Sequence, residues 1–134
     1  MSGSAEVELC GLVARLNQRL DAHVRRVADS LGITASQAIA LRELSGPMTL
    51  TELAERMGCE ASNAGYVIDR MEAQDLVVRK PHPTDRRAKR LTLTSGGKRC
   101  RANVLKALGQ QAPMDALSAA DQVALADLLR RATR

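Results

Sequence analysis

Apolar residues recur every three or four positions through the first thirty residues of the chain. This period is typical of an amphipathic helix, and it predicts one long helix from Glu6 to Ser30. Gly32 follows, and it can adopt the left-handed conformation that ends many helices. The apolar stripe of this helix consists of Leu9, Val13, Leu16, Leu20, Val24, Val27 and Leu31.

Two capping boxes divide the next part of the chain into short helices. The segment Thr34–Gln37 has a hydroxyl and an amide at the spacing that opens a helix, which we expect to run through Leu44. The segment Thr49–Glu52 repeats this arrangement before a helix that Gly58 ends. A further helix is predicted from about Ala61 to Gln74. Its buried face would carry Ala64, Val67, Ile68 and Met71.

A β-hairpin is predicted after these helices. Leu76–Arg79 is too short and too β-branched for a helix, and Arg90–Thr94 alternates apolar and polar residues with the period of a strand. Leu91 and Leu93 would face the core. The segment between the strands begins KPHPTD, and its two prolines keep it from joining either strand as regular structure.

The chain beyond Thr94 returns to a helical pattern. One helix is expected to about Gln111, where Pro113 breaks it. Ser118–Asp121 then caps a last amphipathic helix with Val123, Leu125, Leu128 and Leu129. With 134 residues and no internal repeat, the chain is expected to form a single domain spanning 1–134. The predicted fold class is mainly α with a small β-hairpin.

Positive charge is concentrated in one segment of the chain. The whole sequence has 20 basic and 15 acidic residues, hence a net charge of +5. Residues 79–101 alone have nine basic residues and a single acid, Asp85, so this segment carries +8 and the remainder −3. A basic segment on a slightly acidic body indicates a localised contact with a polyanion.

Composition excludes several classes of protein. Tyr66 is the only aromatic residue, which argues against a module that stacks single-stranded nucleic acid. Cys10, Cys59 and Cys100 form no CxxC pair, and without a signal peptide we expect a reducing, cytoplasmic environment. No apolar run reaches the length of a membrane span. The sequence contains no phosphate-binding loop, no nucleophile paired with a base and no spacing typical of metal ligands. We therefore expect no enzyme activity, cofactor or metal site.

The order of the predicted elements is that of a helix-turn-helix with a wing. In such a domain the second helix of the pair enters the major groove of duplex DNA, and the first helix braces it. The wing reaches an adjacent minor groove, where the potential is negative and an arginine fits. The basic segment 79–101 is explained if its loop is the wing that lies along the phosphates.

The residues that carry this pattern resemble the MarR family of bacterial transcription regulators. LTELAERMGCEASNAGYVIDRMEAQDLVVR, residues 50–79, is similar to the paired helices and following strand of that family, and DRRAKRLTLTSGG, residues 85–97, is similar to its wing. The resemblance implies a winged helix-turn-helix lobe at about 34–94 and dimerisation helices at about 5–31 and 95–133. It further implies a homodimer on a pseudo-palindromic operator, acting as a repressor that a small-molecule effector releases.

The resemblance also implies roles for single residues of the recognition helix. Ser62, Asn63 and Tyr66 would lie on its exposed face and contact DNA. Tyr66 and the residue before it depart from the family, which often has Thr or Ser followed by Gly or Arg, so the family's base preferences do not transfer. Glu60 occupies a capping position where Ser or Thr is common. Its carboxylate suits a helix N-terminus but faces phosphate less favourably.

In the wing, the resemblance implies that Asp85 is a bracing residue and that Arg87 enters the minor groove. Asp85 is close enough in sequence to hold the Arg87 guanidinium through a bidentate pair. His82 is expected to face phosphate. The flanking residues that would contact phosphates are Arg86, Lys89 and Arg90.

Two alternatives remain open. The segment ELCGLV around Cys10 resembles the peroxide-sensing segment of the OhrR branch of the family, so Cys10 is a candidate redox residue. That branch supplies tyrosine partners from nearby helices, and this chain has none there. An ordinary buried thiol is therefore favoured at Cys10. A winged helix that binds protein instead of DNA is the alternative from another class, and the basic wing argues against it.

Overall fold

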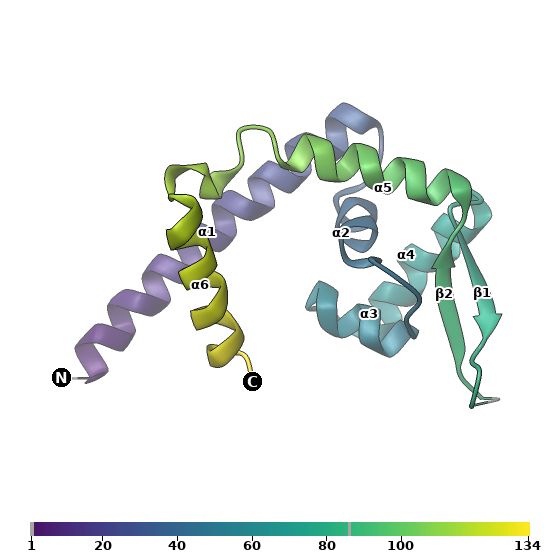
Figure 1. Ribbon diagram of the computed structural model, residues 1–134, viewed down its shortest axis with the longest axis horizontal. Coiled ribbons are helices and arrows are strands. Elements are labelled where there is room, and N and C mark those ends of the chain that lie inside the picture. The colour runs from purple at the N-terminus through teal and green to yellow at the C-terminus, as the bar shows by residue number, and fades with distance from the viewer. Residues whose placement is uncertain (1, 86) are drawn as a thin grey trace. The chain divides into compact units, whose positions relative to one another are not determined.

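A computed structural model describes residues 2–85 and 87–134. The described chain folds into two compact units. The central unit is Val24–Leu108, and the terminal unit combines Met1–His23 with Gly109–Arg134. The elements in chain order are α1 (Ser2–Leu31), α2 (Ala35–Glu43), α3 (Leu50–Met57), α4 (Ala61–Ala73), β1 (Val77–Pro81), β2 (Lys89–Leu93), α5 (Ser95–Leu108), the 3-10 helix η1 (Pro113–Ala116) and α6 (Ala119–Ala132) (Figure 1).

Both predicted capping boxes are present. The Thr34 hydroxyl accepts from the Gln37 backbone N–H at the start of α2, and the Gln37 side chain accepts from the Thr34 backbone N–H. Thr49 and Glu52 do the same at the start of α3. Gly58 ends α3 with a φ of 71°, in the left-handed region that glycine adopts without strain. The sequence therefore predicted these helix starts and this stop correctly.

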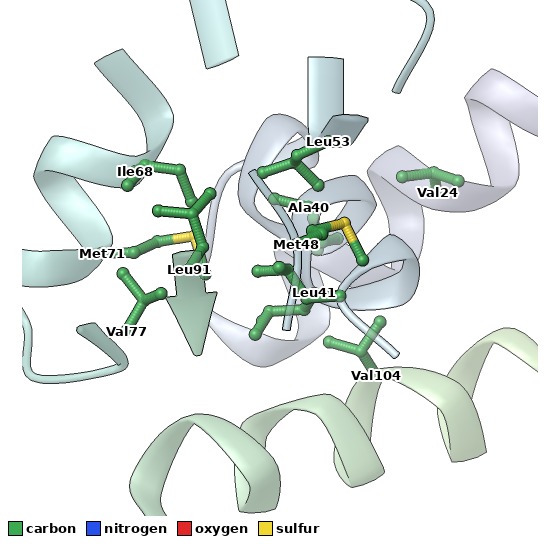
Figure 2. Close-up of a cluster of buried hydrophobic side chains, with 13 residues drawn as sticks. Val24, Ala40, Leu41, Met48, Leu53, Ile68, Met71, Val77, Leu91 and Val104 are labelled. Carbon is green, nitrogen blue, oxygen red and sulfur yellow. The ribbon is translucent and has the colours of Figure 1, made fainter. Parts of the chain in front are cut away.

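The core of the central unit consists of aliphatic side chains and methionines. Leu41, Leu53 and Ile68 are fully buried and come from α2, α3 and α4. Met48, just before α3, forms an isolated antiparallel bridge with Leu91 of β2, which ties the helix pair to the hairpin. Figure 2 shows these side chains gathered with others from α1, β1 and α5. The paired helices and the hairpin thus share one hydrophobic core.

The hairpin is antiparallel, and both of its strands lie one to two residues further toward its tip than predicted. Val77 pairs with Leu93 at its base and Pro81 pairs with Lys89 at its outer end. Proline can end a strand in a two-stranded sheet because its missing N–H removes no bond to a further strand. Leu91 is buried, whereas Leu93 is only half-buried and packs against the core.

Helix α5 belongs to the central unit. Its Val104 is buried, and the Arg101 guanidinium donates to the carbonyl oxygens of Leu41 (2.9 Å) and Arg42 (3.2 Å) at the end of α2. Near the start of α5, a Cβ at Gly97 would lie 2.0 Å from the Leu76 carbonyl oxygen, so only glycine fits there. The helix ends at Leu108, three residues before the predicted limit. Whether it also contributes to a dimer stays a prediction.

The terminal unit has apolar side chains that lie in solvent. The structure describes every residue of α6, and none of them is buried. Among its large apolar side chains, Val123 is 71% exposed and Leu128 55%, and on α1 Val7 is 74% exposed and Leu9 60%. Over the described residues, no helix is both long and apolar enough to cross a membrane.

Candidate nucleic-acid interface

Helix α4, the predicted recognition helix, has one buried and one open face. Tyr66 is 74% exposed, and Ser62 and Asn63 are exposed as well. Residues three and four apart lie on one side of a helix, so both polar residues share the face of Tyr66. The structure thus leaves open the face on which these residues were predicted to contact DNA. The residues buried on the other side are Ala64, Ile68 and Met71.

The turn that leads into α4 is held by backbone groups. The Cys59 N–H donates to the Ala54 carbonyl oxygen (3.0 Å), which closes the turn after α3. Glu60 is the N-cap of α4, but its side chain makes no capping hydrogen bond. The helix pair α3–α4 is therefore joined through the glycine turn and the shared core, without help from the Glu60 carboxylate.

The pKa of the Glu52 carboxylate, on α3, depends on the hydrogen bonds and charges around it. The backbone N–H of Thr49 lowers the pKa of Glu52 most, followed by the Thr49 hydroxyl, and the positive charges of Arg56 and Arg90 lower it further. Arg90 lies on β2, where it is half-buried. Its charge therefore acts on the helix pair as well as on the outer surface of the wing.

The tip of the wing is a closed turn between β1 and β2. The His82 N–H donates to the Ala88 carbonyl oxygen (3.2 Å), and the Ala88 N–H donates to the Asp85 carbonyl oxygen (3.3 Å). Arg87 and Lys89 are exposed beside this turn. Arg86, predicted to contact phosphate, lies outside the described residues.

Asp85 braces the tip through a different bond from the predicted one. Its Oδ1 atom accepts from the backbone N–H of Arg87 at 3.0 Å. Over the described residues, the ion pairs do not include a pair between the Asp85 carboxylate and the Arg87 guanidinium. The short aspartate side chain reaches the backbone amide two residues ahead more readily than it reaches the end of a long arginine side chain. Its hydrogen bond therefore stabilises the turn.

Sequence reasoning missed a set of ion pairs that joins α4 to the hairpin. Arg79 of β1 donates from Nη1 to Glu72 Oε1 (2.8 Å) and from Nη2 to Asp69 Oδ1 (2.9 Å). Both acids are on α4, three residues apart and so on one face. That spacing, followed by an arginine at the first strand, was the available signal. The single positive charge of Arg79 offsets one of these two negative charges, and its guanidinium pairs with both carboxylates.

Other candidate groups lie elsewhere in the chain. Cys10 is exposed rather than buried, so the interpretation as an ordinary buried thiol is wrong for the single chain. It lines an apolar hollow of about 520 Å³ within the terminal unit, together with residues such as Val13 and Leu129. Among the described residues, no group of His, Cys, Asp or Glu could hold a metal ion.

A cavity of about 430 Å³ lies in the central unit, between the loop after α2, the base of β2 and the first turns of α5. Its apolar wall includes Leu44, Pro47 and Leu93. Lys98 and Arg101 are its two charged lining residues, and both are basic. The cavity therefore favours a small anionic molecule with an apolar body.

Comparison with known proteins identifies relatives of the central unit. Residues 33–89 match the family model for the MarR family. In Bacillus subtilis strain 168, the uncharacterized HTH-type transcriptional regulator YsmB is 36% identical over 77 residues, which cover 56% of this chain and 53% of YsmB. The HTH-type transcriptional repressor MdtR of the same organism is 31% identical over 84 residues, covering 61% and 54%. The chain thus spans about half the length of the curated relatives it matches.

Solved structures extend the likeness over most of the chain. The structure of BpsR from Bordetella bronchiseptica has a TM-score of 0.77 and 26% sequence identity, and the match covers 95% of this chain and 99% of BpsR. That structure concerns the regulation of BpsR DNA binding by 6-hydroxynicotinic acid. The predicted fold class, mainly α with a β-hairpin wing, is confirmed by this likeness.

Proposed function

Because residues 33–89 match the MarR family model, we propose that the chain is a MarR-family, double-stranded DNA-binding transcriptional repressor that acts as a homodimer. The observation that best supports this function is that the two candidate DNA-binding features share one hydrophobic core. The open polar face of α4 and the basic hairpin are joined by the Arg79 ion pairs and by contact between α4 and β1. Helix α4 and the hairpin lie beside each other (Figure 1). We therefore expect the recognition helix and the wing to approach a duplex as one body.

The predicted DNA-binding residues divide by the contact they would make. Ser62, Asn63 and Tyr66 are assigned to base edges in the major groove, because they lie on the open face of α4. Arg87 is assigned to the minor groove, where a guanidinium gains most from a narrow, negative channel. The residues assigned to phosphates, which add affinity without sequence information, are Arg86, Lys89 and Arg90.

Dimerisation is assigned to the terminal unit. Its Val7, Leu9, Val123 and Leu128 are each more than half exposed, and apolar side chains gathered on a surface mark a site of association. A second copy would cover that surface and would set two recognition helices about one DNA turn apart, roughly 34–36 Å. Such an arrangement reads a pseudo-palindromic operator.

Release from DNA is assigned to a small anionic effector. The cavity lined by Lys98 and Arg101 offers two positive charges beside an apolar wall. It touches the loop between α2 and α3, the base of β2 and α5. A ligand there would contact the loop that leads into α3 and the base of the wing. BpsR, whose DNA binding 6-hydroxynicotinic acid regulates, offers a precedent for such an effector.

The test is binding to the DNA beside the chain's own coding region, which we expect to contain an inverted repeat. Fluorescence anisotropy would compare that duplex with a scrambled duplex over a salt series. We expect tighter binding of the repeat and a steep loss of affinity with salt. Equal, weak binding of both duplexes would contradict the proposal and would favour the protein-interaction alternative.

Wing variants refine this test. Arg87→Ala should cost about 1–3 kcal/mol and relax the preference for an A·T-rich flank. Lys89→Ala, the matched control on the same hairpin, should weaken all duplexes alike and reduce the salt slope by about one counterion. Asp85→Ala should also weaken binding, although it removes a negative charge near DNA. Tighter binding by Asp85→Ala would mean that the wing is only a charge patch.

A thiol-based regulator is the second candidate, favoured by the exposure of Cys10. If Cys10 senses peroxide, an organic hydroperoxide should release DNA from the natural chain and leave the Cys10→Ser variant bound. We expect instead that both proteins keep binding, because Tyr66, on α4, is the only tyrosine in the chain. Loss of binding by the natural chain alone would establish the sensor.

A further inference from the structure

His82 has a structural position in the wing that its sequence context did not suggest. It follows the last residue of β1 and is half-buried, although its neighbours Pro83 and Thr84 are exposed. Its ring Nδ1 atom accepts from the backbone N–H of Thr84 (3.2 Å) and from the backbone N–H of Asp85 (3.2 Å). The Thr84 hydroxyl also lies 3.3 Å from Nδ1. The imidazole is therefore turned back onto the tip of the loop rather than extended away from it.

The chemistry of these contacts defines the state of the ring. A backbone N–H can only donate, so an Nδ1 atom that faces two of them has to offer its lone pair. The proton of the neutral ring is then on Nε2. An imidazolium would carry a proton on Nδ1 and would point it at two other donors. These contacts of Nδ1 with the loop differ from the phosphate-facing role that we expected for His82.

The surrounding sequence explains why the ring is used in this way. Pro83 has no N–H, so the first backbone donors after His82 belong to Thr84 and Asp85. Proline also confines the preceding residue to extended conformations, which lets the His82 side chain reach forward over the turn. A short side chain that accepts from amides two and three residues ahead is the device by which Asx turns are stabilised. Here the Nδ1 atom of histidine occupies the place of the Asx oxygen.

We propose that His82 is the positioning residue of the wing: its Nδ1 acceptor sets the tip conformation that presents Arg87 to DNA. The inference rests on the proposed DNA-binding function. A relay of bonds supports it, because Nδ1 holds the Asp85 amide, and the Asp85 carboxylate in turn holds the Arg87 amide at 3.0 Å. His82 acts through this relay and does not itself contact phosphate. Its contribution is the pre-ordering of the loop, which lowers the conformational entropy lost on binding.

Three substitutions at one position separate positioning from charge. In His82→Asn the side-chain oxygen lies near the place of Nδ1, whereas in His82→Gln it lies one bond further out, near the place of Nε2. His82→Arg supplies a permanent positive charge and no acceptor. We expect His82→Asn to bind the inverted-repeat duplex within about twofold of the natural chain. We expect His82→Gln and His82→Arg to bind roughly tenfold more weakly, a loss of about 1.4 kcal/mol.

The opposite ranking would overturn the inference. If His82 contacts phosphate, His82→Arg should bind as tightly as the natural chain or more tightly, and His82→Asn should lose affinity and reduce the salt slope. Thermal melting by circular dichroism checks that all three variants are folded. The exposed loop makes a large change in melting temperature unexpected for any of them.

A measurement without DNA keeps the inference separate from the proposed function. Nitrogen-15 NMR of the histidine ring should show Nδ1 unprotonated and Nε2 protonated at neutral pH. The amide signals of Thr84 and Asp85 should change little in His82→Asn and move markedly in His82→Gln. The role of His82 would be overturned, even if the protein binds DNA, by a protonated Nδ1 or by Thr84 and Asp85 amide signals that move in neither variant. Failure of the natural chain to bind any duplex would overturn the proposed function instead.

Discussion

The central and terminal units of this chain use the same kind of side chain in opposite ways. In the central unit, Leu41, Leu53 and Ile68 have no exposed surface. In the terminal unit, Leu9 and Leu128 are more than half exposed, and among its described residues only His23 is buried. Both regions have the apolar spacing of amphipathic helices. The difference shows that helical periodicity identifies a face to be covered but does not identify what covers it.

The comparison separates two sources of stability. The central unit buries its apolar residues against its own helices and hairpin, so its stability is expected to be independent of protein concentration. The terminal unit has apolar area that only association can remove from water, so its order should depend on a second copy. Four predictions test this division, from the largest expected effect to the smallest.

The largest effect should come from the same substitution made once in each unit. Leu41→Ala should lower the free energy of unfolding of the central unit by about 2–5 kcal/mol, because it removes buried methyl groups and leaves a cavity. Leu128→Ala, on exposed α6, should change it by less than about 0.5 kcal/mol. Amide hydrogen exchange in residues 24–108 would measure both. Equal losses would remove the distinction between the units.

A charge on the exposed apolar surface should next disrupt association. Leu128→Glu should weaken the dimer by on the order of 3 kcal/mol, about a hundredfold, because an interface would bury an unpaired carboxylate. Asp127→Lys, one residue away and already polar, is the matched control. Sedimentation would give the oligomeric state, also for a chain that lacks residues 113–134. A stable, DNA-competent dimer after that truncation would contradict the assignment of dimerisation to the terminal unit.

A smaller effect is expected within the central unit, where function and stability can be separated. Arg79→Met should hardly change stability, because partly exposed ion pairs contribute only about 0–1 kcal/mol. It should weaken DNA binding roughly tenfold, about 1.4 kcal/mol, since Asp69 and Glu72 then place bare negative charge on the recognition helix. Adding Asp69→Asn and Glu72→Gln to Arg79→Met should restore binding. Failure to restore it would mean that Arg79 contacts DNA itself.

The smallest effect concerns pH and the cap of α3. The folded pKa of Glu52 is lower than its ordinary value, so the ionised side chain stabilises the fold above that value. This contribution is lost as pH decreases through the lowered pKa. Glu52→Gln keeps a capping-box side chain and should therefore reduce the pH dependence of unfolding. Urea midpoints at about pH 7 and about pH 3 would measure it, and an unchanged difference would contradict the assignment to Glu52.

Local patterns predicted most of the fold. The helix starts at Thr34 and Thr49, the stop at Gly58 and the pairing of two short strands depend on neighbouring residues, and each was confirmed. The end of α5 was misplaced because the pattern continues past Leu108, where the chain leaves the central unit. Such an end depends on tertiary packing, which periodicity does not contain.

Less of the candidate site could be predicted from the sequence. The open face of α4 could be predicted, because the apolar positions define its opposite side. The Arg79 ion pairs join residues seven and ten positions apart across a turn, and no local rule specifies that approach. The role of His82 depends on the direction of one ring nitrogen in a folded loop. Contacts of this kind are set by the backbone path, so charge patterns alone suggested a phosphate contact instead.

The close approach at Gly97 has a consequence for the evolution of this chain. Any side chain there would collide with the Leu76 carbonyl oxygen, whereas a Cβ at Gly3 or Gly11 would meet nothing within 4 Å. Substitution at Gly97 should therefore be selected against, whatever operator a descendant protein reads. If Ser62, Asn63 and Tyr66 contact bases as proposed, a lineage could exchange its DNA target by changing them while this buried contact stayed the same. Position 97 would then record common descent after those three residues had ceased to do so.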